Sequence, residues 1–237
     1  MLRQELTARQ LDEQLTARFG PDPGPLRVLD AGLGWSGRGE QALRLARAGH
    51  RVTGLDSDPA VLAFVRDALD GEPAETRKRL RLVAAGGQDT GAHFLPGAFD
   101  VVLCHGVLMA SRDPASTLAG LARVLAPGGL LSLLVRNDAA LALHPGRAGD
   151  WEAALAAFDF PERERGLRLD RLTTLLAGSG TPLHAWYGVQ VFATSSTAPA
   201  DDPRMLAAEE RAGRTDPYRA VAAMLHLCGV RAAPSAG

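Results

Sequence analysis

The stretch V-L-D-A-G-L-G-W-S-G-R-G-E, residues 28–40, decides the fold. Its apolar start predicts a short strand over 27–31, and Gly32, Gly34 and Gly37 then spell G-x-G-x-x-G at the start of a helix. Glycines at such a turn let a ligand approach the backbone closely, and the N-terminus of the next helix offers free N–H groups. The stretch therefore predicts a strand–turn–helix unit that binds a nucleotide-like ligand.

Acidic residues at two strand ends help to identify that ligand. Asp30 would face the pyrophosphate of a dinucleotide such as NAD, where like charges repel, whereas it suits S-adenosylmethionine (SAM), which carries an ammonium and a sulfonium and no phosphate. Asp56 ends the next strand, where a carboxylate can bind both ribose hydroxyls of an adenosine. The alternatives are that Asp30 only caps backbone N–H groups and that Asp56 caps a helix, although Ser57 or Asp58 fits the cap position better.

Composition bounds the class of protein. The 237 residues suffice for a single α/β domain over 1–237, and 46% hydrophobic and 22% charged residues are typical of a globular protein. A net charge of -1 gives no general attraction for nucleic acid or an anionic membrane. Cys104 and Cys228 have no metal-binding or disulfide-framework spacing, so we expect no metal. No stretch is apolar enough to span a membrane, and we expect a cytoplasmic monomer.

Strand and helix patterns alternate along the chain. Residues 1–20 predict an amphipathic N-terminal helix, and further strands are predicted at 51–55, 80–84, 99–104, 130–135, 184–192 and 224–230. Because the strands are continuous apolar runs separated by helices, they predict a parallel sheet covered on both faces. The pattern loosens over 136–180, which we interpret as a substrate-side insertion or lid. An ordinary surface excursion is the alternative.

Four motifs in order resemble a class I SAM-dependent methyltransferase: V-L-D-A-G-L-G (28–34), G-L-D-S-D-P (54–59), F-D-V-V-L-C-H-G-V-L (99–108) and L-A-P-G-G-L-L-S-L-L-V (125–135). The resemblance covers residues 27 to about 135. It implies a Rossmann-like, seven-stranded, mostly parallel sheet with helices on both faces. It also implies SAM as the cofactor and S-adenosylhomocysteine as its product.

A narrower likeness extends over most of the chain. L-R-Q (2–4), A-A-G-G-Q-D (84–89), C-H-G-V-L (104–108), R-N-D-A-A-L (136–141), Y-G-V-Q-V-F (187–192) and D-P-Y-R-A-V-A-A-M-L-H-L (216–227) resemble the tRNA 5-carboxymethoxyuridine methyltransferases, which esterify a carboxylate on a modified wobble uridine. The two resemblances together imply these cofactor-binding residues: Arg3, Asp30, Ala31, Gly32, Gly34, Asp56, Ser57, Gln88, Asp89 and His105. The alternatives are that Arg3 is merely solvated and that His105 is structural.

Departures from the narrower family fall in substrate-facing parts. The chain begins inside the segment that carries the family's N-terminal arginine, so the preceding residues that would fold over the cofactor are expected to be absent, either by a genuine difference from the family or because the start is assigned too late. L-M-A stands at 108–110 instead of an acidic–aromatic pair, F-P-E-R-E-R-G-L-R-L-D at 160–170 has mixed charge instead of a basic stretch, and A-T-S-S-T follows at 193–197. The prediction of the cofactor is therefore stronger than that of the tRNA acceptor.

Methyl transfer from SAM is an in-line displacement that depends mainly on alignment. An acceptor carboxylate is already ionised and needs no general base; His105 and His144 are possible bases for other acceptors, and no catalytic residue is assigned. Arg136, Asn137 and Tyr218 are candidates for orienting the acceptor. Three hypotheses remain open: methylation of tRNA, O- or N-methylation of a small metabolite, and a SAM-binding protein without catalysis.

Overall fold

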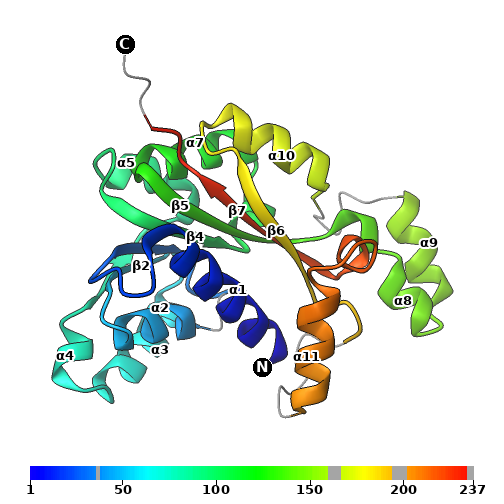
Figure 1. Ribbon diagram of the computed structural model, residues 1–237, viewed down its shortest axis with the longest axis horizontal. Helices are drawn as coiled ribbons and strands as arrows, with labels where there is room; N and C mark the ends of the chain where they lie inside the picture. Colours follow the sequence, from blue (N-terminus) through cyan, green and yellow to red (C-terminus); the bar gives the residue numbers. More distant parts are fainter. Residues whose placement is uncertain (36–37, 160–166, 194–201, 234–237) are drawn as a thin grey trace.

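The computed structural model describes residues 1–35, 38–159, 167–193 and 202–233 (Figure 1). Within these residues seven strands form one sheet in the order β3-β2-β1-β4-β5-β7-β6. Strand β7 is antiparallel to both β5 and β6, and the other neighbouring pairs are parallel, which confirms the predicted mostly parallel sheet. The strands are β1 Arg27–Ala31, β2 Arg51–Asp56, β3 Leu80–Ala84, β4 Phe99–His105, β5 Leu125–Arg136, β6 Leu183–Val189 and β7 Met224–Val230.

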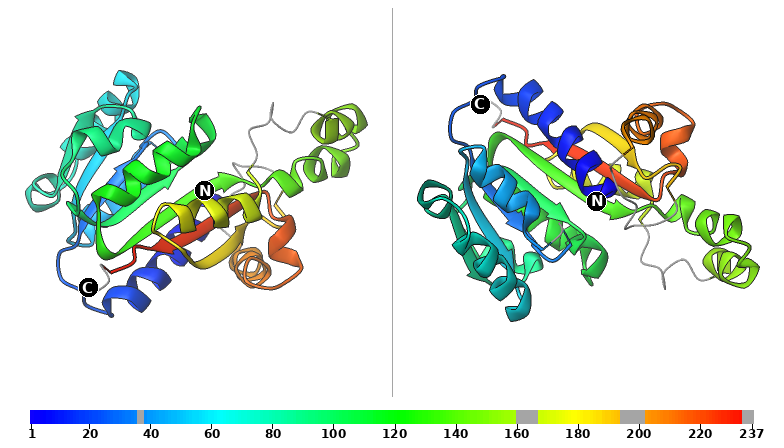
Figure 2. Two further views of the ribbon diagram at one scale, coloured as in Figure 1. Left: turned by 90° about the horizontal axis from the view of Figure 1, so that it is seen from above. Right: turned by 90° about the horizontal axis from the view of Figure 1, so that it is seen from below.

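Helices cover both faces of this sheet, as Figure 2 shows from two sides. Successive strand residues alternate between the faces: Val28 belongs to a core with α1, α2 and α3, whereas Leu29 belongs to a core with α7 and α10. The α-helices are α1 Leu2–Phe19, α2 Glu40–Arg47, α3 Pro59–Asp70, α4 Ala74–Arg77, α5 Thr90–His93, α6 Val107–Ala110, α7 Pro114–Val124, α8 Leu143–Arg147, α9 Trp151–Asp159, α10 Leu169–Gly178 and α11 Pro203–Ala212. Short 3₁₀ turns are η1 Gly87–Asp89, η2 Asp138–Ala140 and η4 Tyr218–Val221.

Two strands differ by several residues from the sequence-based boundaries, whereas β2 and β4 each end one residue later than predicted. Strand β5 begins at Leu125 rather than at 130, because Leu125 already pairs with Phe99 before the register shifts at the Pro-Gly-Gly segment. Strand β6 ends at Val189 rather than at 192, because Gln190 has a positive φ of 62°. The buried Glu209 carboxylate of α11 then accepts the N–H groups of residues 191–193, which removes them from the sheet ladder.

Helix α1 begins near the carboxyl end of β5 and runs toward the opposite edge of the sheet, where Arg18 near its end contacts Gly128. Its first turns carry Leu2 and Leu6, which are buried against Leu134 of β5, Val189 of β6 and Met224 of β7. The amphipathic pattern of the N-terminal helix therefore docks its first turn at the side of the sheet where the glycine-rich turn lies. This docking brings residue 3 to that side as well.

The chain leaves the sheet after β5 and forms η2, α8 and α9 before α10 returns to pack against α7 and β6. Both views in Figure 2 show α8 and α9 projecting beyond the end of the sheet. Three large side chains of α9, those of Trp151, Leu155 and Phe158, are mostly exposed. In the described part of the chain, no helix combines the length and apolar character that crossing a bilayer requires.

Candidate functional site

A cavity of about 270 Å³ lies where β1, β2 and β4 end. Because parallel strands end on the same edge of the sheet, the turns that follow them meet there. The lining residues are Gly32, Gly34, Trp35, Asp56, Ser57, Asp58, Val61, Gly87, Gly106, Val107 and Ala110. Four of the predicted cofactor-binding residues, Gly32, Gly34, Asp56 and Ser57, are among them.

Glycine is required at two points of this cavity. Gly32 has a φ of 105°, and a Cβ there would lie 2.2 Å from Cγ2 of Val107. Gly106 has a φ of 85°, and a Cβ there would lie 2.1 Å from Cγ of Trp35. Any side chain at either position would force its neighbours apart, so the close approach of the two turns depends on glycine.

Asp56 joins the turn after β1 to the turn after β2. Its Oδ2 accepts the N–H of Gly34 at 2.9 Å, and its Oδ1 accepts the N–H of Asp58 at 2.9 Å. The N-cap of α3 is Asp58, whose carboxylate accepts the N–H of Ala60 at 2.8 Å, so Asp56 does not cap that helix. A carboxylate has about four acceptor positions, and Asp56 therefore keeps capacity for ligand hydroxyls in the cavity that it lines.

Arg3 lies next to this cavity through its contact with Trp35. The guanidinium carbon is 5.2 Å from the centre of the indole ring, a cation–π arrangement, and the ring covers Gly106. Burial lowers the pKa of Arg3. Among the described residues Arg3 has no ion-pair partner, so its half-buried charge is available to an anionic group beside Trp35.

Asp30 and Ala31 lie deeper than the cavity lining. Both are fully buried in β1, and neither side chain lines the cavity. Burial raises the pKa of the Cys104 thiol to about 12, and the nearby carboxylate of Asp30 adds to this effect. Contact of either residue with a cofactor stays a prediction.

His105 is buried as well, with 1% of its surface exposed. Its Nε2 lies 2.9 Å from Oγ of Ser132 on β5. Burial, reinforced by the charge of Arg3, lowers the pKa of His105 to about 4, so the ring is neutral at physiological pH. The structure thus places His105 in the wall behind Gly106, where one nitrogen already has a structural partner.

The Gln88–Asp89 pair follows β3 in the turn η1. Gly87, at the start of this turn, lines the cavity next to Val107. Asp89 is exposed, and the side chain of Gln88 lies outside the described residues, as does Gly37 of the glycine motif. The backbone of this turn lies beside the cavity, which is compatible with hydrogen bonds from Gln88 and Asp89 to the edge of an adenine. That role of the two residues stays a prediction.

The three candidate acceptor-orienting residues lie at or near the carboxyl end of β5. Arg136 is half-buried at the end of that strand, and its backbone N–H contacts Sδ of Met109. Asn137 donates its amide to the carbonyls of Ala220 and Ala222 at 2.9 and 2.8 Å, and thereby holds η4 in place. Tyr218 begins η4 and is exposed. Of the three, Asn137 is committed to backbone partners.

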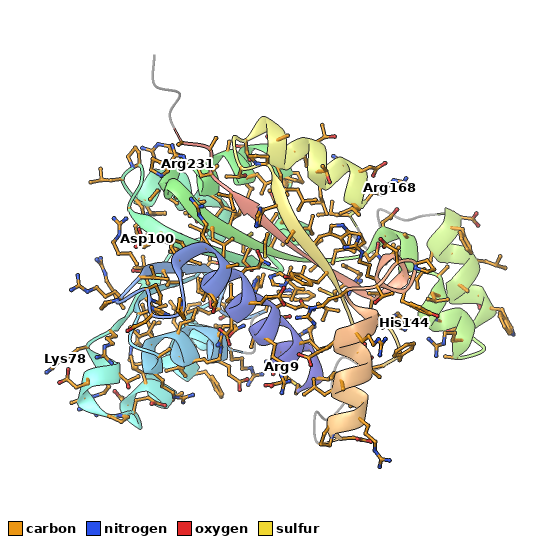
Figure 3. The ribbon with its side chains drawn as sticks, in the orientation of Figure 1. Arg9, Lys78, Asp100, His144, Arg168 and Arg231 are labelled. Carbon is orange, nitrogen blue, oxygen red and sulfur yellow. The ribbon has the colours of Figure 1, made fainter. Side chains whose placement is uncertain are left out.

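His144 lies on α8, and Figure 3 shows it beside α11, on the opposite side of the molecule from Lys78 and Asp100. It does not line the cavity next to Asp56. Burial lowers its pKa, with a further contribution from Arg147. Neither of the two candidate bases, His105 and His144, lines the cavity, and the structure does not bring them together.

A larger groove of about 880 Å³ lies between η2, α8 and α9. It is lined by Asp138, Ala139, Ala142, Leu143, Gly146, Arg147, Trp151, Ala154, Leu155, Ala157, Phe158 and Arg168. Helix α6 lies between the groove and the cavity. Its Val107 and Ala110 line the cavity, and its Met109 contacts Arg136, which precedes the first groove residue, Asp138. The predicted insertion thus contains an apolar groove with arginines at its edge.

Sequence reasoning missed several lining residues. Trp35, Val61, Val107 and Ala110 line the cavity, although none is a polar residue in a recognisable motif. Trp35 lies inside the glycine motif at a variable position, and a tryptophan beside glycines in a predicted ligand turn was the available signal. The contact of Val107 with Gly32 required knowledge of how two distant turns meet.

Several known proteins are similar to this chain in sequence. Residues 29–133 match a family model described as a methyltransferase domain. The tRNA 5-carboxymethoxyuridine methyltransferase of Escherichia coli K12 is 34% identical over 151 residues, which cover 64% of this chain and 54% of the relative. A ubiquinone biosynthesis O-methyltransferase of Xanthomonas oryzae pv. oryzae is 35% identical over 119 residues, covering 49% of this chain and 46% of the relative. The chain therefore spans about half the length of these curated relatives.

Solved structures show the same architecture. The 1,6-didemethyltoxoflavin-N1-methyltransferase of Burkholderia thailandensis, solved with 1,6-didemethyltoxoflavin and S-adenosylhomocysteine, superposes with a TM-score of 0.57 at 19% identity, covering 95% of this chain and 78% of that one. A SAM-dependent methyltransferase of Methanosarcina mazei gives a TM-score of 0.61 at 16% identity, covering 88% and 93%. The protein has the class I methyltransferase fold.

Proposed function

We propose that the protein is a SAM-dependent methyltransferase whose cofactor binds in the cavity between Gly32, Asp56 and Gly106. The observation that carries the proposal is the position of Asp56, which is held by two backbone N–H groups and lines the cavity with unused acceptor capacity. A carboxylate at the end of the second strand suits the ribose hydroxyls of an adenosine. The glycine cradle and the methyltransferase domain match support the same conclusion.

The residues around the cavity fit the remaining parts of SAM. Arg3 offers a half-buried cation to the methionine carboxylate, a charge-assisted pair of the strong kind. Trp35 holds that guanidinium over its ring. The narrow approach at Gly32 leaves room for an adenosine or methionine moiety only because no side chain is present. No phosphate-binding cation is needed for this assignment.

The chemistry asks little of the protein beyond alignment. SAM supplies a methyl group on a sulfonium, which is a good leaving group. Asp56 and Arg3 would anchor the two ends of the cofactor and so orient the methyl group toward the acceptor side of the cavity. An ionised carboxylate acceptor needs no base, and Arg136, at the end of β5, would pair with such a carboxylate.

For the acceptor we propose the carboxylate of a modified wobble uridine in tRNA, as named for the Escherichia coli relative. The test is liquid chromatography–mass spectrometry of tRNA nucleosides after incubation of the purified protein with SAM and tRNA that carries the free acid. We expect the methyl ester to appear only when protein and SAM are both present. A strain that lacks the gene and still has normal ester levels, together with no transfer in vitro, would exclude this acceptor.

A small acceptor is the second candidate, and the groove between α8 and α9 favours it. Its lining is largely apolar, and its charges are mixed, with Asp138, Arg147 and an Arg168 that pairs with Asp170 at 3.2 Å. Such a surface offers little to a phosphate backbone and much to an apolar or aromatic molecule. The ubiquinone biosynthesis relative is named for an acceptor pathway of that kind. A screen of metabolites for SAM-dependent mass gain distinguishes the two.

Three further parts of the proposal concern the whole protein. We propose one methyltransferase domain over 1–237 with residues 136–180 as its acceptor-side lid, a monomeric state and a cytoplasmic location. A SAM-binding protein without catalysis is the remaining alternative. Tight binding of S-adenosylhomocysteine with no turnover on tRNA or in the metabolite screen would favour that alternative.

A further inference from the structure

A buried chain of hydrogen bonds crosses the sheet behind the cavity. His105 Nε2 of β4 lies 2.9 Å from Ser132 Oγ of β5, which lies 2.8 Å from His226 Nε2 of β7. His226 Nδ1 in turn lies 2.9 Å from Gln10 Oε1 of α1. All four side chains are 0–1% exposed, so the chain has no competition from bulk water.

The direction of this chain is set at its α1 end. The carbonyl of Gly188 only accepts hydrogen bonds, so the Gln10 atom 3.3 Å from it is the amide nitrogen. The amide oxygen of Gln10 therefore faces His226, and His226 Nδ1 carries a hydrogen that it donates. Gln10 thus fixes which nitrogen of His226 is protonated.

The hydrogen positions of the other members follow from His226. Burial lowers the pKa of His226 to about 3, so the ring is neutral and its Nε2 is an acceptor. The hydroxyl of Ser132 donates to it. Cys228 Sγ lies 3.7 Å from the same nitrogen, and burial raises the pKa of that thiol to about 12, so the thiol also acts there as a donor.

His105 is the last member, at the carboxyl end of β4. Because the Ser132 hydroxyl is donated to His226, Ser132 Oγ accepts from His105, and the hydrogen of the neutral His105 ring is on Nε2. Nδ1 of His105 is then an unprotonated acceptor, and it has no hydrogen-bond partner among the residues that the structure describes. His105 directly precedes Gly106 of the cavity, and its carbonyl oxygen lies 3.8 Å from the Cβ position of Gly32.

We propose that Gln10, His226 and Ser132 are positioning residues that hold His105 in the Nε2–H tautomer and so keep its Nδ1 as a hydrogen-bond acceptor for an N–H donor of the ligand. The role toward a ligand rests on the proposed function, in which the methionine ammonium of SAM is such a donor. The same chain ties the cofactor side of β4 to α1, the helix that carries Arg3. Residues outside the cavity thereby select the hydrogen-bonding state of a residue in its wall.

The tautomers are measured directly by long-range ¹H–¹⁵N correlation of the histidine rings in the ¹⁵N-labelled, ligand-free protein. We expect the hydrogen of His105 on Nε2 and that of His226 on Nδ1, assigned by the loss of ring signals in His226→Asn. The opposite tautomers, or a charged ring at pH 7, would overturn the proposal whether or not the protein binds SAM. Failure of S-adenosylhomocysteine to bind a protein with the expected tautomers would instead overturn the proposed function.

Gln10→Met tests the control exerted from α1. Without the amide oxygen, the hydrogen of His226 moves to Nε2, the chain reverses, and His105 becomes the Nδ1–H tautomer. We expect this change in the spectrum and about a tenfold loss of affinity for S-adenosylhomocysteine, the size expected when one hydrogen bond is lost. An unchanged His105 tautomer in folded Gln10→Met would contradict the proposal.

Gln14→Met is the matched control. Gln14 is also a buried glutamine of α1, but its amide donates to the Tyr187 hydroxyl at 2.6 Å and takes no part in the chain. We expect a comparable loss of thermal stability with unchanged tautomers and unchanged affinity. A Gln14→Met protein that loses as much affinity as Gln10→Met would show a general effect of α1 packing and overturn the positioning role.

Discussion

The cavity next to Asp56 and the groove between α8 and α9 are built in different ways. The cavity next to Asp56, of about 270 Å³, is confined by glycines whose neighbours leave no space for a side chain and by a carboxylate fixed on two backbone N–H groups. The groove of about 880 Å³ between α8 and α9 is bordered by side chains that are 64–75% exposed, such as Leu155 and Phe158. The difference indicates that the first hollow is shaped for one ligand, whereas the second tolerates change.

Gly32→Ala should break the first hollow and have the largest effect. The added Cβ meets Val107 Cγ2 at 2.2 Å in a backbone with a φ of 105°. We expect overpacking to lower the unfolding free energy by about 1–3 kcal/mol in addition to backbone strain, and cofactor affinity to be lost. Denaturant unfolding and titration with S-adenosylhomocysteine measure the two effects.

Gly49→Ala is the control for backbone strain alone. Gly49 has a φ of 100°, and a Cβ there has nothing within 4 Å. We expect a cost of about 1–2 kcal/mol and unchanged affinity. Equal costs for the two variants would mean that the contact between Gly32 and Val107 does not confine the cavity.

Acid should destabilise the folded protein through the two buried histidines behind the cavity. The folded-state pKa values of His105 and His226, about 4 and about 3, lie below the ordinary value of 6.5, so the unfolded state binds more protons as the pH falls. Stability is therefore lost below about pH 6.5, with a slope of up to about 1.4 kcal/mol per pH unit for each histidine. Urea unfolding between pH 7 and 4.5 measures this slope.

His226→Asn sharpens the acid experiment because it removes one titrating ring from the buried chain. We expect its unfolding free energy to fall less steeply with decreasing pH than that of the wild type, whatever its stability at pH 7. Parallel curves for the two proteins would show that His226 is not held neutral by burial.

Substitution in the groove should have the smallest effect on the fold. Trp151→Ser with Phe158→Ser removes side chains that are 69% and 75% exposed, so we expect stability within about 0.5 kcal/mol of the wild type and unchanged cofactor affinity. The kcat/KM for the acceptor should fall about tenfold, since apolar contact area is lost. A loss of cofactor affinity would show that the two hollows are not independent.

The same contrast explains what the sequence could predict. Gly32, Gly34, Asp56 and Ser57 lie in a contiguous motif or at a strand end, where local pattern and position in a parallel sheet suffice, and all four line the cavity. Trp35 and Val107 were missed because their role arises when two turns distant in sequence meet. Helix α8 and the groove follow no periodic pattern strong enough to predict.

His105 shows a second limit of sequence-based prediction. Its position after β4 predicted a ligand contact, but the contacts that set its chemistry come from Ser132, His226 and Gln10, which lie on β5, β7 and α1. No spacing in the chain links these residues. Only the sheet order, which places β4, β5 and β7 side by side, brings them together.

Calorimetric titration of S-adenosylhomocysteine into the wild type and into Asp56→Ala tests the central claim most directly. Asp67→Asn, on the exposed side of α3, is the control for loss of one negative charge. Loss of the Asp56 carboxylate removes the ribose acceptor and leaves the N–H groups of Gly34 and Asp58 without it. We expect binding to weaken about 100-fold in Asp56→Ala and less than about twofold in Asp67→Asn. Wild-type affinity in Asp56→Ala, or no binding by the wild type, would contradict the account.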